Sequence, residues 1–211
     1  MALKLQRRAF LQTAMAIVAA ASSGVMRAAA AGNDAVTIGW PNDIPSWDPN
    51  QRFTPDAQPI FKAVFDQPLD QDPQLNLVAH LIKRWSLAPD ALSMAVELRD
   101  DVKFHNGDKM STGDFRYTFF ERIKSGTKLD TANSWQKVQD IVIESPTRAV
   151  MKFDSPAPTA PQWMAFLGSY LVPKKYIETA GLDTFRQQAD RDGTLQAGRV
   201  RAQFPHRARA Q

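Results

Sequence analysis

The sequence contains no cysteine, so a disulfide, a thiolate metal site and a lipid-modified cysteine anchor are all excluded. It contains only three histidines, and none has a second ligand at the spacing that a histidine-based metal centre uses. Phosphate-binding loops, nucleophile elbows and metalloprotease motifs are also missing. The sequence therefore predicts no cofactor and no metal, and it gives no positive sign of an enzyme.

The excess of positive charge is confined to the two ends of the chain. The formal net charge is +4, but residues 1–31 hold four Lys or Arg and no acid, and residues 187–211 hold five Arg and two Asp. Removing these ends from the totals of 26 basic and 22 acidic residues leaves 17 basic and 20 acidic residues in 32–186, a net charge of −3. Because nucleic-acid binding needs a basic surface, the sequence predicts none.

The first 31 residues have the order of an export signal. Residues 6–12 read QRRAFLQ, which is close to the twin-arginine pattern. The apolar stretch at 14–21 is too short to cross a membrane as a stop-transfer helix, and residues 28–31 offer small-residue cleavage sites. The signal is carried by Arg7, Arg8, Phe10 and Leu11. The segment predicts export of a soluble monomer to the periplasm by the twin-arginine translocase, with an N-terminal anchor helix as the alternative.

A strand, a tight turn and a capped helix are expected between residues 84 and 124. Apolar and polar residues alternate over 92–98, which is the pattern of a half-buried strand. Asn106-Gly107 supplies a turn, since both residues tolerate positive φ. Ser111 and Asp114 have the spacing of a capping box, and the helical spacing that follows ends at Ser125-Gly126.

Other patterns complete the expected organisation. Residues 36–40 alternate like a first strand, and residues 60–65 have helical spacing. Residues 138–144 and 148–153 predict a hairpin, and Trp163 is expected on a short helix. We expect Trp163 and Trp135 to lie in the core.

The stretch from Arg84 to Lys124 resembles the bacterial extracellular solute-binding proteins of the peptide/nickel type, family 5. That family's pattern is a Trp, then Asp-Gly, a strand ending in Leu-Arg, then Val-Lys-Phe-His-Asp-Gly and a helix opened by Thr-Ala-Glu-Asp. The matching positions are Trp85, Asp90, Leu98, Arg99, Val102, Lys103, Phe104, His105, Gly107 and Asp114. Departures are Ala91 in place of Gly, Asn106 in place of Asp, and Thr112-Gly113 in place of Ala-Glu.

This resemblance covers roughly residues 35–186 and identifies a scaffold. It implies an α/β fold, namely one incomplete lobe of the periplasmic-binding-protein type II kind, with a mixed sheet and flanking helices. It also implies a protein that captures an oligopeptide, a nickel complex or a related small solute and delivers it to an ABC permease in the inner membrane. The matched residues, His105 included, are read as structural, and Arg99 is expected to pair with a nearby acid.

Ligand contacts are expected in the loop that follows the first strand. Trp40 and Trp47 can cover an apolar part of a solute, and Asn42 and Asp43 can hydrogen-bond its polar part. A buried Trp40 followed by a plain turn is the equal alternative. The return of the chain and the whole second lobe of the family are missing, so we expect impaired ligand binding, because capture by hinge closure needs both lobes.

The segment 187–211 is expected to be an aberrant, disordered tail. Back-translated from Gln188 and read one base later, its codons permit Lys-Pro-Ile-Gly-Thr-Gly-Pro-Tyr-Lys-Leu-Val-Glu. In the family that the chain resembles, Pro-x-Gly-Thr-Gly-Pro-Tyr follows a Gly-Leu-Asp-x-Phe stretch, which here is residues 181–185. The expectation is a frameshift caused by one inserted base.

Three parts are therefore expected: a signal at 1–31, an incomplete lobe at 32–186 and the tail at 187–211. A stand-alone interaction module with a functional basic tail is the second hypothesis. A hydrolase is the third, without a supporting motif.

Overall fold

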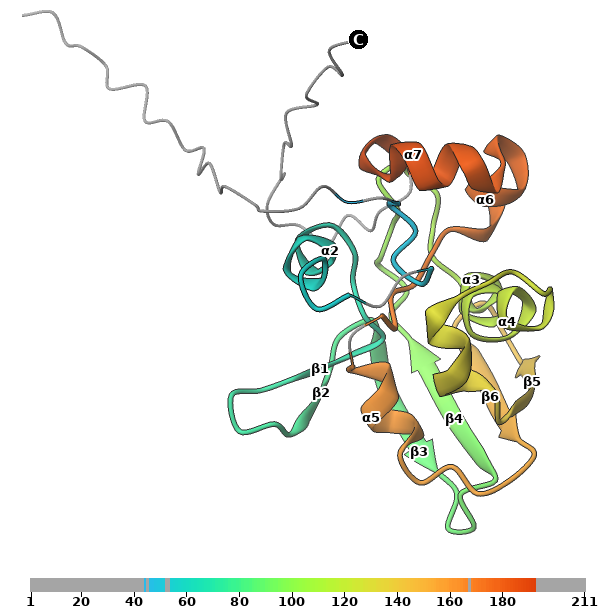
Figure 1. Cartoon of the computed structure of the whole chain (residues 1–211). Helices are drawn as coiled ribbons and strands as arrows, with labels where there is room; N and C mark the ends of the chain where they lie inside the picture. The colour runs from blue at the N-terminus through green and yellow to red at the C-terminus, as the bar shows by residue number, and fades with distance from the viewer. Residues whose placement is uncertain (1–43, 45, 52–53, 167, 193–211) are drawn as a thin grey trace, which may run out of the picture. The chain divides into compact units, whose positions relative to one another are not determined.

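The computed structural model describes residue 44 and residues 46–51, 54–166 and 168–192. The expected export signal and the expected first strand lie outside these residues. Elements in the first part of the described chain are α2 (Gln58–Val64), β1 (Leu69–Gln71), β2 (Leu77–Ala79), β3 (Ile82–Leu87) and β4 (Ser93–Leu98). They are followed by a long helix, a 3-10 helix, a β-hairpin and three further helices (Figure 1).

A four-stranded sheet forms the centre of the lobe. Its strand order is β3-β4-β6-β5, where β5 is Val138–Ile143 and β6 is Arg148–Phe153. The alternation that predicts β4 appears directly in its burial, since Met94, Val96 and Leu98 are buried while Ala95 between them is exposed. Every pairing in this sheet is antiparallel, whereas a mixed sheet was expected.

One continuous helical segment covers the buried face of the sheet. It consists of α3 (Thr112–Arg116), a π-helical turn (Tyr117–Glu121) and α4 (Arg122–Lys124). The predicted capping box is present, because the Ser111 side chain accepts from the Gly113 amide and Asp114 accepts from the Ser111 amide. Gly126, at φ +77°, follows the end of the helix as expected. The π turn had no signal in the sequence.

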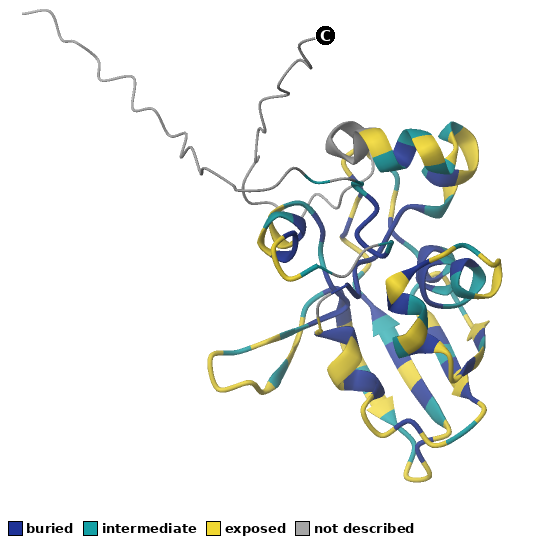
Figure 2. Cartoon of the chain, in the orientation of Figure 1, coloured by how far each residue is buried: buried dark blue, intermediate teal, exposed yellow. Residues whose placement is uncertain are grey.

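The sheet cluster, defined as the buried residues that pack between the strands and this helix, is the larger of two apolar cores. The 3-10 helix Asp130–Trp135 and α5 (Ala160–Met164) also contribute to it. Phe119 lies with its ring centroid 5.0 Å from Phe115 and 4.9 Å from Trp135. Figure 2 shows buried and exposed residues alternating along β4.

The second cluster joins segments from the two ends of the described chain. Its buried members are Ala57, Phe61, Phe65, Tyr170, Val172, Ile177 and Phe185. They come from α2, from the extended segment before α6 (Lys174–Ala180), from α6 itself and from α7 (Leu182–Asp192). Aromatic rings meet edge to face there, with the Phe65 and Phe185 centroids 6.4 Å apart.

Several expectations need correction. Trp163 is 37% exposed and meets the exposed Phe166 ring edge to face, so it is a surface residue, whereas Trp135 is buried as predicted. Helix α7 runs through Asp192, so residues 187–192 of the expected disordered tail are helical, and 193–211 lie outside the described residues.

Within the part of the chain that the structure describes, no helix has both the length and the apolar character needed to span a bilayer.

Candidate functional site

A pocket of about 480 Å³ lies where three segments meet. The segments are the loop 46–51, the residues that lead into the 3-10 helix, and the middle of α7. The side chains that give it its character are Ser46, Gln51, Lys128, Asp130, Asp183 and Arg186. All of these residues are polar or charged.

The pocket presents both signs of charge. Lys128 and Arg186 supply cations, and Asp130 and Asp183 supply carboxylates. Arg186 Nη1 lies 3.2 Å from Asp183 Oδ1, but its Nε is buried without a hydrogen-bond partner within the described part of the chain. A solute that carries both an amine and a carboxylate, or a polar acceptor for Arg186, suits such a lining.

The wall made by loop 46–51 is ordered by its own side chains. Ser46 Oγ donates to Gln51 Oε1 at 2.7 Å and accepts from the Asp48 amide at 3.2 Å. The Asn50 amide donates to Asp48 Oδ1 at 3.2 Å, a local turn of the kind that Asp favours. The loop therefore holds a defined shape before any solute arrives.

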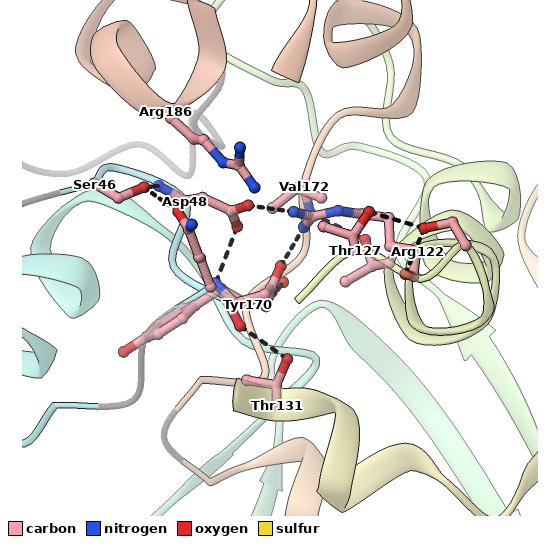
Figure 3. A network of polar contacts seen from close by, with 12 residues as sticks. Ser46, Asp48, Arg122, Thr127, Thr131, Tyr170, Val172 and Arg186 are labelled. Atoms are coloured by element: carbon pink, nitrogen blue, oxygen red, sulfur yellow. Dashed lines mark hydrogen bonds and ion pairs between the residues drawn. The ribbon is translucent and has the colours of Figure 1, made fainter. Parts of the chain in front are cut away.

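A buried polar network lies beneath this loop (Figure 3). Arg122 donates to Asp48 and, at 2.7 Å, to Asn50 Oδ1. Asn50 Nδ2 in turn donates to the carbonyls of Gly168 and Tyr170, at 2.7 and 3.2 Å. The side chains of Asp48 and Arg122 are 0% and 3% exposed, so this ion pair is fully removed from water.

The predicted ligand residues are only partly within the described structure. Trp40, Asn42 and Asp43 lie outside the described residues. Trp47 is half-buried and packs against the second cluster, and its amide donates to the Arg186 carbonyl at 2.8 Å. The pocket wall is instead formed by Ser46 and Gln51, which flank the predicted position.

The residues of the family pattern lie in structural positions along the sheet. Leu98, Val102 and Phe104 are buried in the sheet cluster, and Trp85 packs against it. Asp90 accepts from the Leu92 amide at 3.0 Å. None of these residues lines the pocket.

Two positions of this pattern have a positive φ. Gly107 has φ +87° and closes the tight turn that was predicted there. Ala91 also has a positive φ, +54°, a conformation that Gly adopts without strain. The Gly-to-Ala change at this position therefore carries a backbone cost.

The charged members of the pattern pair locally. Arg99 holds Asp101 through two hydrogen bonds of 2.9 and 2.7 Å, which lowers the pKa of that exposed carboxyl. Asp114 caps its helix, and burial raises its pKa despite the amides that it accepts from. His105 is exposed in its turn. Among the described residues, no group of three His, Asp or Glu side chains gathers as a metal site.

Asp48, Asn50 and Arg122 are the residues that sequence reasoning missed. An arginine near the end of a helix is expected to be exposed to solvent. The only sequence signal that Arg122 is buried is that it follows Thr118 and Phe119, which are also buried, near the end of the helix. Asp48-Pro49 predicts a turn, but Arg122, with which Asp48 forms an ion pair, lies far along the chain. Tertiary contact alone reveals the pair.

The sequence profile of the bacterial extracellular solute-binding proteins, family 5 Middle, matches residues 76–196. No curated protein matches the sequence. Among solved structures, NikZ from Campylobacter jejuni in complex with Ni(L-His) is 22% identical, with a TM-score of 0.62 over 69% of this chain and 29% of that one.

Two structures with bound peptides are similar to the same extent. AppA from Bacillus subtilis, in complex with a nonapeptide, is 15% identical with a TM-score of 0.61 over 72% of this chain and 30% of that one. OppA from Haemophilus influenzae, in complex with RPPGFSPFR, is 19% identical with a TM-score of 0.61 over 67% and 31%. The described lobe thus has the fold of part of a type II periplasmic binding protein, and the chain spans less than a third of the length of these relatives.

Proposed function

The chain belongs to the bacterial extracellular solute-binding proteins of family 5, and we propose that its lobe forms one side of a solute-binding cleft that serves an ABC importer. The solute is an oligopeptide, a nickel complex or a related small molecule, in keeping with the compounds bound by the similar structures. Capture is noncovalent, and the chain performs no reaction.

The observation that carries this proposal is the charged pocket at loop 46–51. It combines two cations and two carboxylates with the hydroxyl of Ser46 and the amide of Gln51. Such groups orient a polar or zwitterionic solute without needing a nucleophile or a metal. The pocket also flanks the loop position at which the sequence predicts ligand contacts.

Solute capture requires a second lobe in this mechanism. Two-lobed binding proteins close by a hinge, so that each lobe contributes part of the solute's surroundings and excludes water. A lobe alone offers an open surface, on which each charge remains solvated and contributes little to affinity. We therefore propose that the 211-residue chain by itself holds solute weakly or not at all.

The reading frame of the DNA is the first thing to determine. We propose that one inserted base before the codon of Gln188 shifts the frame, although the family match extends to residue 196 and α7 to Asp192. Resequencing the genomic DNA from the codons of Phe185 to Arg191 and onward tests this. An intact family sequence in the shifted frame supports the proposal, and its absence in every frame refutes it.

Solute binding is then tested with two proteins, namely residues 32–211 and the product of the restored frame. Thermal shifts are measured with a panel of peptides and with nickel and histidine. We expect a saturable shift for the restored product only. A reproducible, saturable shift for residues 32–211 would show that the lobe is competent alone.

Pocket variants of the restored product identify the site. Arg186→Met and Asp130→Asn should weaken binding by about tenfold or more, because each removes a charge-assisted hydrogen bond. Lys175→Met is the matched control, since Lys175 is an exposed cation that pairs with Asp108 outside the pocket. Equal effects of all three variants would place the solute elsewhere.

A basic tail with its own function is the second proposal, favoured by the unbroken continuation of α7 to Asp192. Deletion of residues 188–211 distinguishes a functional tail from a frameshifted remnant. A loss of partner binding supports a functional tail, whereas an unchanged protein supports the frameshift.

Export is proposed to proceed through the twin-arginine translocase, with the periplasm as the destination. A fusion of residues 1–31 to a reporter that is active only after export tests this. Arg7→Lys combined with Arg8→Lys should abolish export, and export that persists would indicate a different route.

A further inference from the structure

The buried Asp48–Arg122 pair has an energetic cost that packing does not explain. Both side chains are withdrawn from water, at 0% and 3% exposure. The desolvation of two charges commonly offsets their attraction, and well-packed apolar residues can be equally stable at such a position. An apolar pair could not hold neighbouring residues by hydrogen bonds, whereas the planar guanidinium donates hydrogen bonds of fixed geometry.

Arg122 donates such hydrogen bonds to two residues of one loop. Its Nη2 donates to Asp48 Oδ2, and its Nη1 donates to Asn50 Oδ1 at 2.7 Å. Arg122 directly follows the π turn, and its guanidinium carbon lies 6.0 Å from the centroid of the Tyr117 ring. In Figure 3 the guanidinium of Arg122 points from the helix toward Asp48.

The other walls of the pocket are attached to the same loop. The Asp130 amide donates to the Gln51 carbonyl at 3.2 Å, and the Trp47 amide donates to the Arg186 carbonyl at 2.8 Å. Thr131 Oγ1 donates to the Asn50 carbonyl at 3.2 Å. Loop 46–51 is therefore the element to which the remaining pocket segments are joined, and Arg122 is the buried group that holds this loop from beneath.

We propose that Arg122 is a positioning residue for the pocket, acting through Asp48 and Asn50 to hold loop 46–51 in the conformation that presents Ser46 and Gln51. The purpose assigned to this arrangement rests on the proposed function, but the positioning itself does not. Replacement of Arg122 by Lys keeps the positive charge but removes the fixed hydrogen-bond geometry of the guanidinium. A lysine ammonium still balances Asp48, yet it is a point charge that lacks the planar fork needed for both acceptors.

The absence of cysteine allows a direct measurement on the full chain. A single cysteine is introduced as Ser46→Cys in the loop, or as Ser155→Cys beyond β6, and its rate of reaction with a soluble thiol reagent is recorded. Both positions have intermediate burial, and Ser155 makes no contact with the network in Figure 3. The ratio of the two rates reports on the loop and is insensitive to a global loss of stability, which would raise both rates together.

Arg122→Lys is expected to raise this ratio by about tenfold or more, which is the effect of losing one hydrogen bond to a charged group. An unchanged ratio in a folded Arg122→Lys variant would overturn the proposal. If circular dichroism shows that this variant does not fold, Asn50→Ala decides by the same ratio, because it leaves the ion pair in place. Since no solute enters this measurement, its outcome is separate from the solute titrations that test the proposed function.

Discussion

The sheet cluster and the second cluster are assembled in different ways. The members of the sheet cluster lie between Leu69 and Leu171; short turns join β3 to β4 and β5 to β6, whereas β4 pairs with β6 across the long helical segment. The second cluster brings the stretch from Ala57 to Phe65 against the stretch from Tyr170 to Phe185. Local pairing forms early and at low entropic cost, whereas the second cluster forms only after a long loop has closed. The sheet region therefore provides the scaffold on which the pocket region is assembled.

The joint between the two regions is a small set of polar contacts made by the long helix. Thr118 Oγ1 accepts from the Val172 amide at 3.2 Å, and Asp114 Oδ1 accepts from the Lys174 amide at 3.0 Å. Lys174 Nζ also lies 2.8 Å from Glu121 Oε2. The same helix packs Phe115 and Phe119 into the sheet cluster, so it belongs to both regions.

The largest expected effect comes from Phe119→Ala. Phe119 is 1% exposed, and its removal leaves a cavity that should lower the unfolding free energy by about 3–5 kcal/mol, with loss of protection throughout the lobe. Phe185→Ala, at a position with 0% exposure, should instead release α6 and α7 while β4 and β6 stay protected. Hydrogen exchange with mass spectrometry compares them. Equal loss in all elements for both variants would mean that the lobe is one cooperative unit.

A smaller effect is expected at the joint from Thr118→Val. This isosteric change leaves the buried Val172 amide without its acceptor and should lower the unfolding free energy by about 1–3 kcal/mol. Thr179→Val is the matched control, because Thr179 is exposed and bonds only within α6, so a change below about 0.5 kcal/mol is expected. Urea titrations provide both values. Similar losses in the two variants would contradict the role of Thr118 as a joint.

The joint should also depend on pH through Asp114. Burial raises the pKa of this carboxyl above its ordinary value of 3.8, so the folded state binds the proton more tightly than the unfolded state. The stabilisation of the folded state by protonated Asp114 is fully present below pH 3.8 and is lost as the pH rises through the pKa of the folded state. Wild-type stability relative to Asp114→Asn should therefore fall across that interval, by at most about 1.4 kcal/mol per pH unit. A relative stability that rises over this range in urea titrations would show that the accepted amides dominate.

The smallest effects are expected at two turns of the sheet region. Ala91→Gly should raise the unfolding free energy by less than about 1 kcal/mol, since Gly removes the strain of φ +54° but gains entropy in the unfolded chain. Gly107→Ala, at φ +87° with open space around the added methyl group, should lower it by about 1 kcal/mol. Thermal unfolding gives both signs. Two changes of the same sign would mean that backbone strain is not the controlling factor.

Local patterns predicted the sheet region well. The alternation over 92–98, the Ser111–Asp114 box and the hairpin about residues 145–147 all have short-range causes, and all are present. The same reasoning failed for Trp163, because an aromatic residue at helical spacing is read as core unless its neighbours are known. The expected ligand contacts of Trp47 stay a prediction, and Trp47 packs against the second cluster.

The family, the strand–turn–helix order and the net charge of residues 32–186 could be predicted before folding was considered, because they depend on residue identity and on neighbours along the chain. Only the tertiary structure decided which polar residues meet. Asp48 and Arg122 are 74 residues apart in the sequence, and neither has a local pattern that marks it as buried. Loop closure brings Asp48 and Arg122 together in a buried site. It also places Ser46, Asp130 and Arg186 around one pocket. That arrangement is a property of the folded chain, which no short-range pattern encodes.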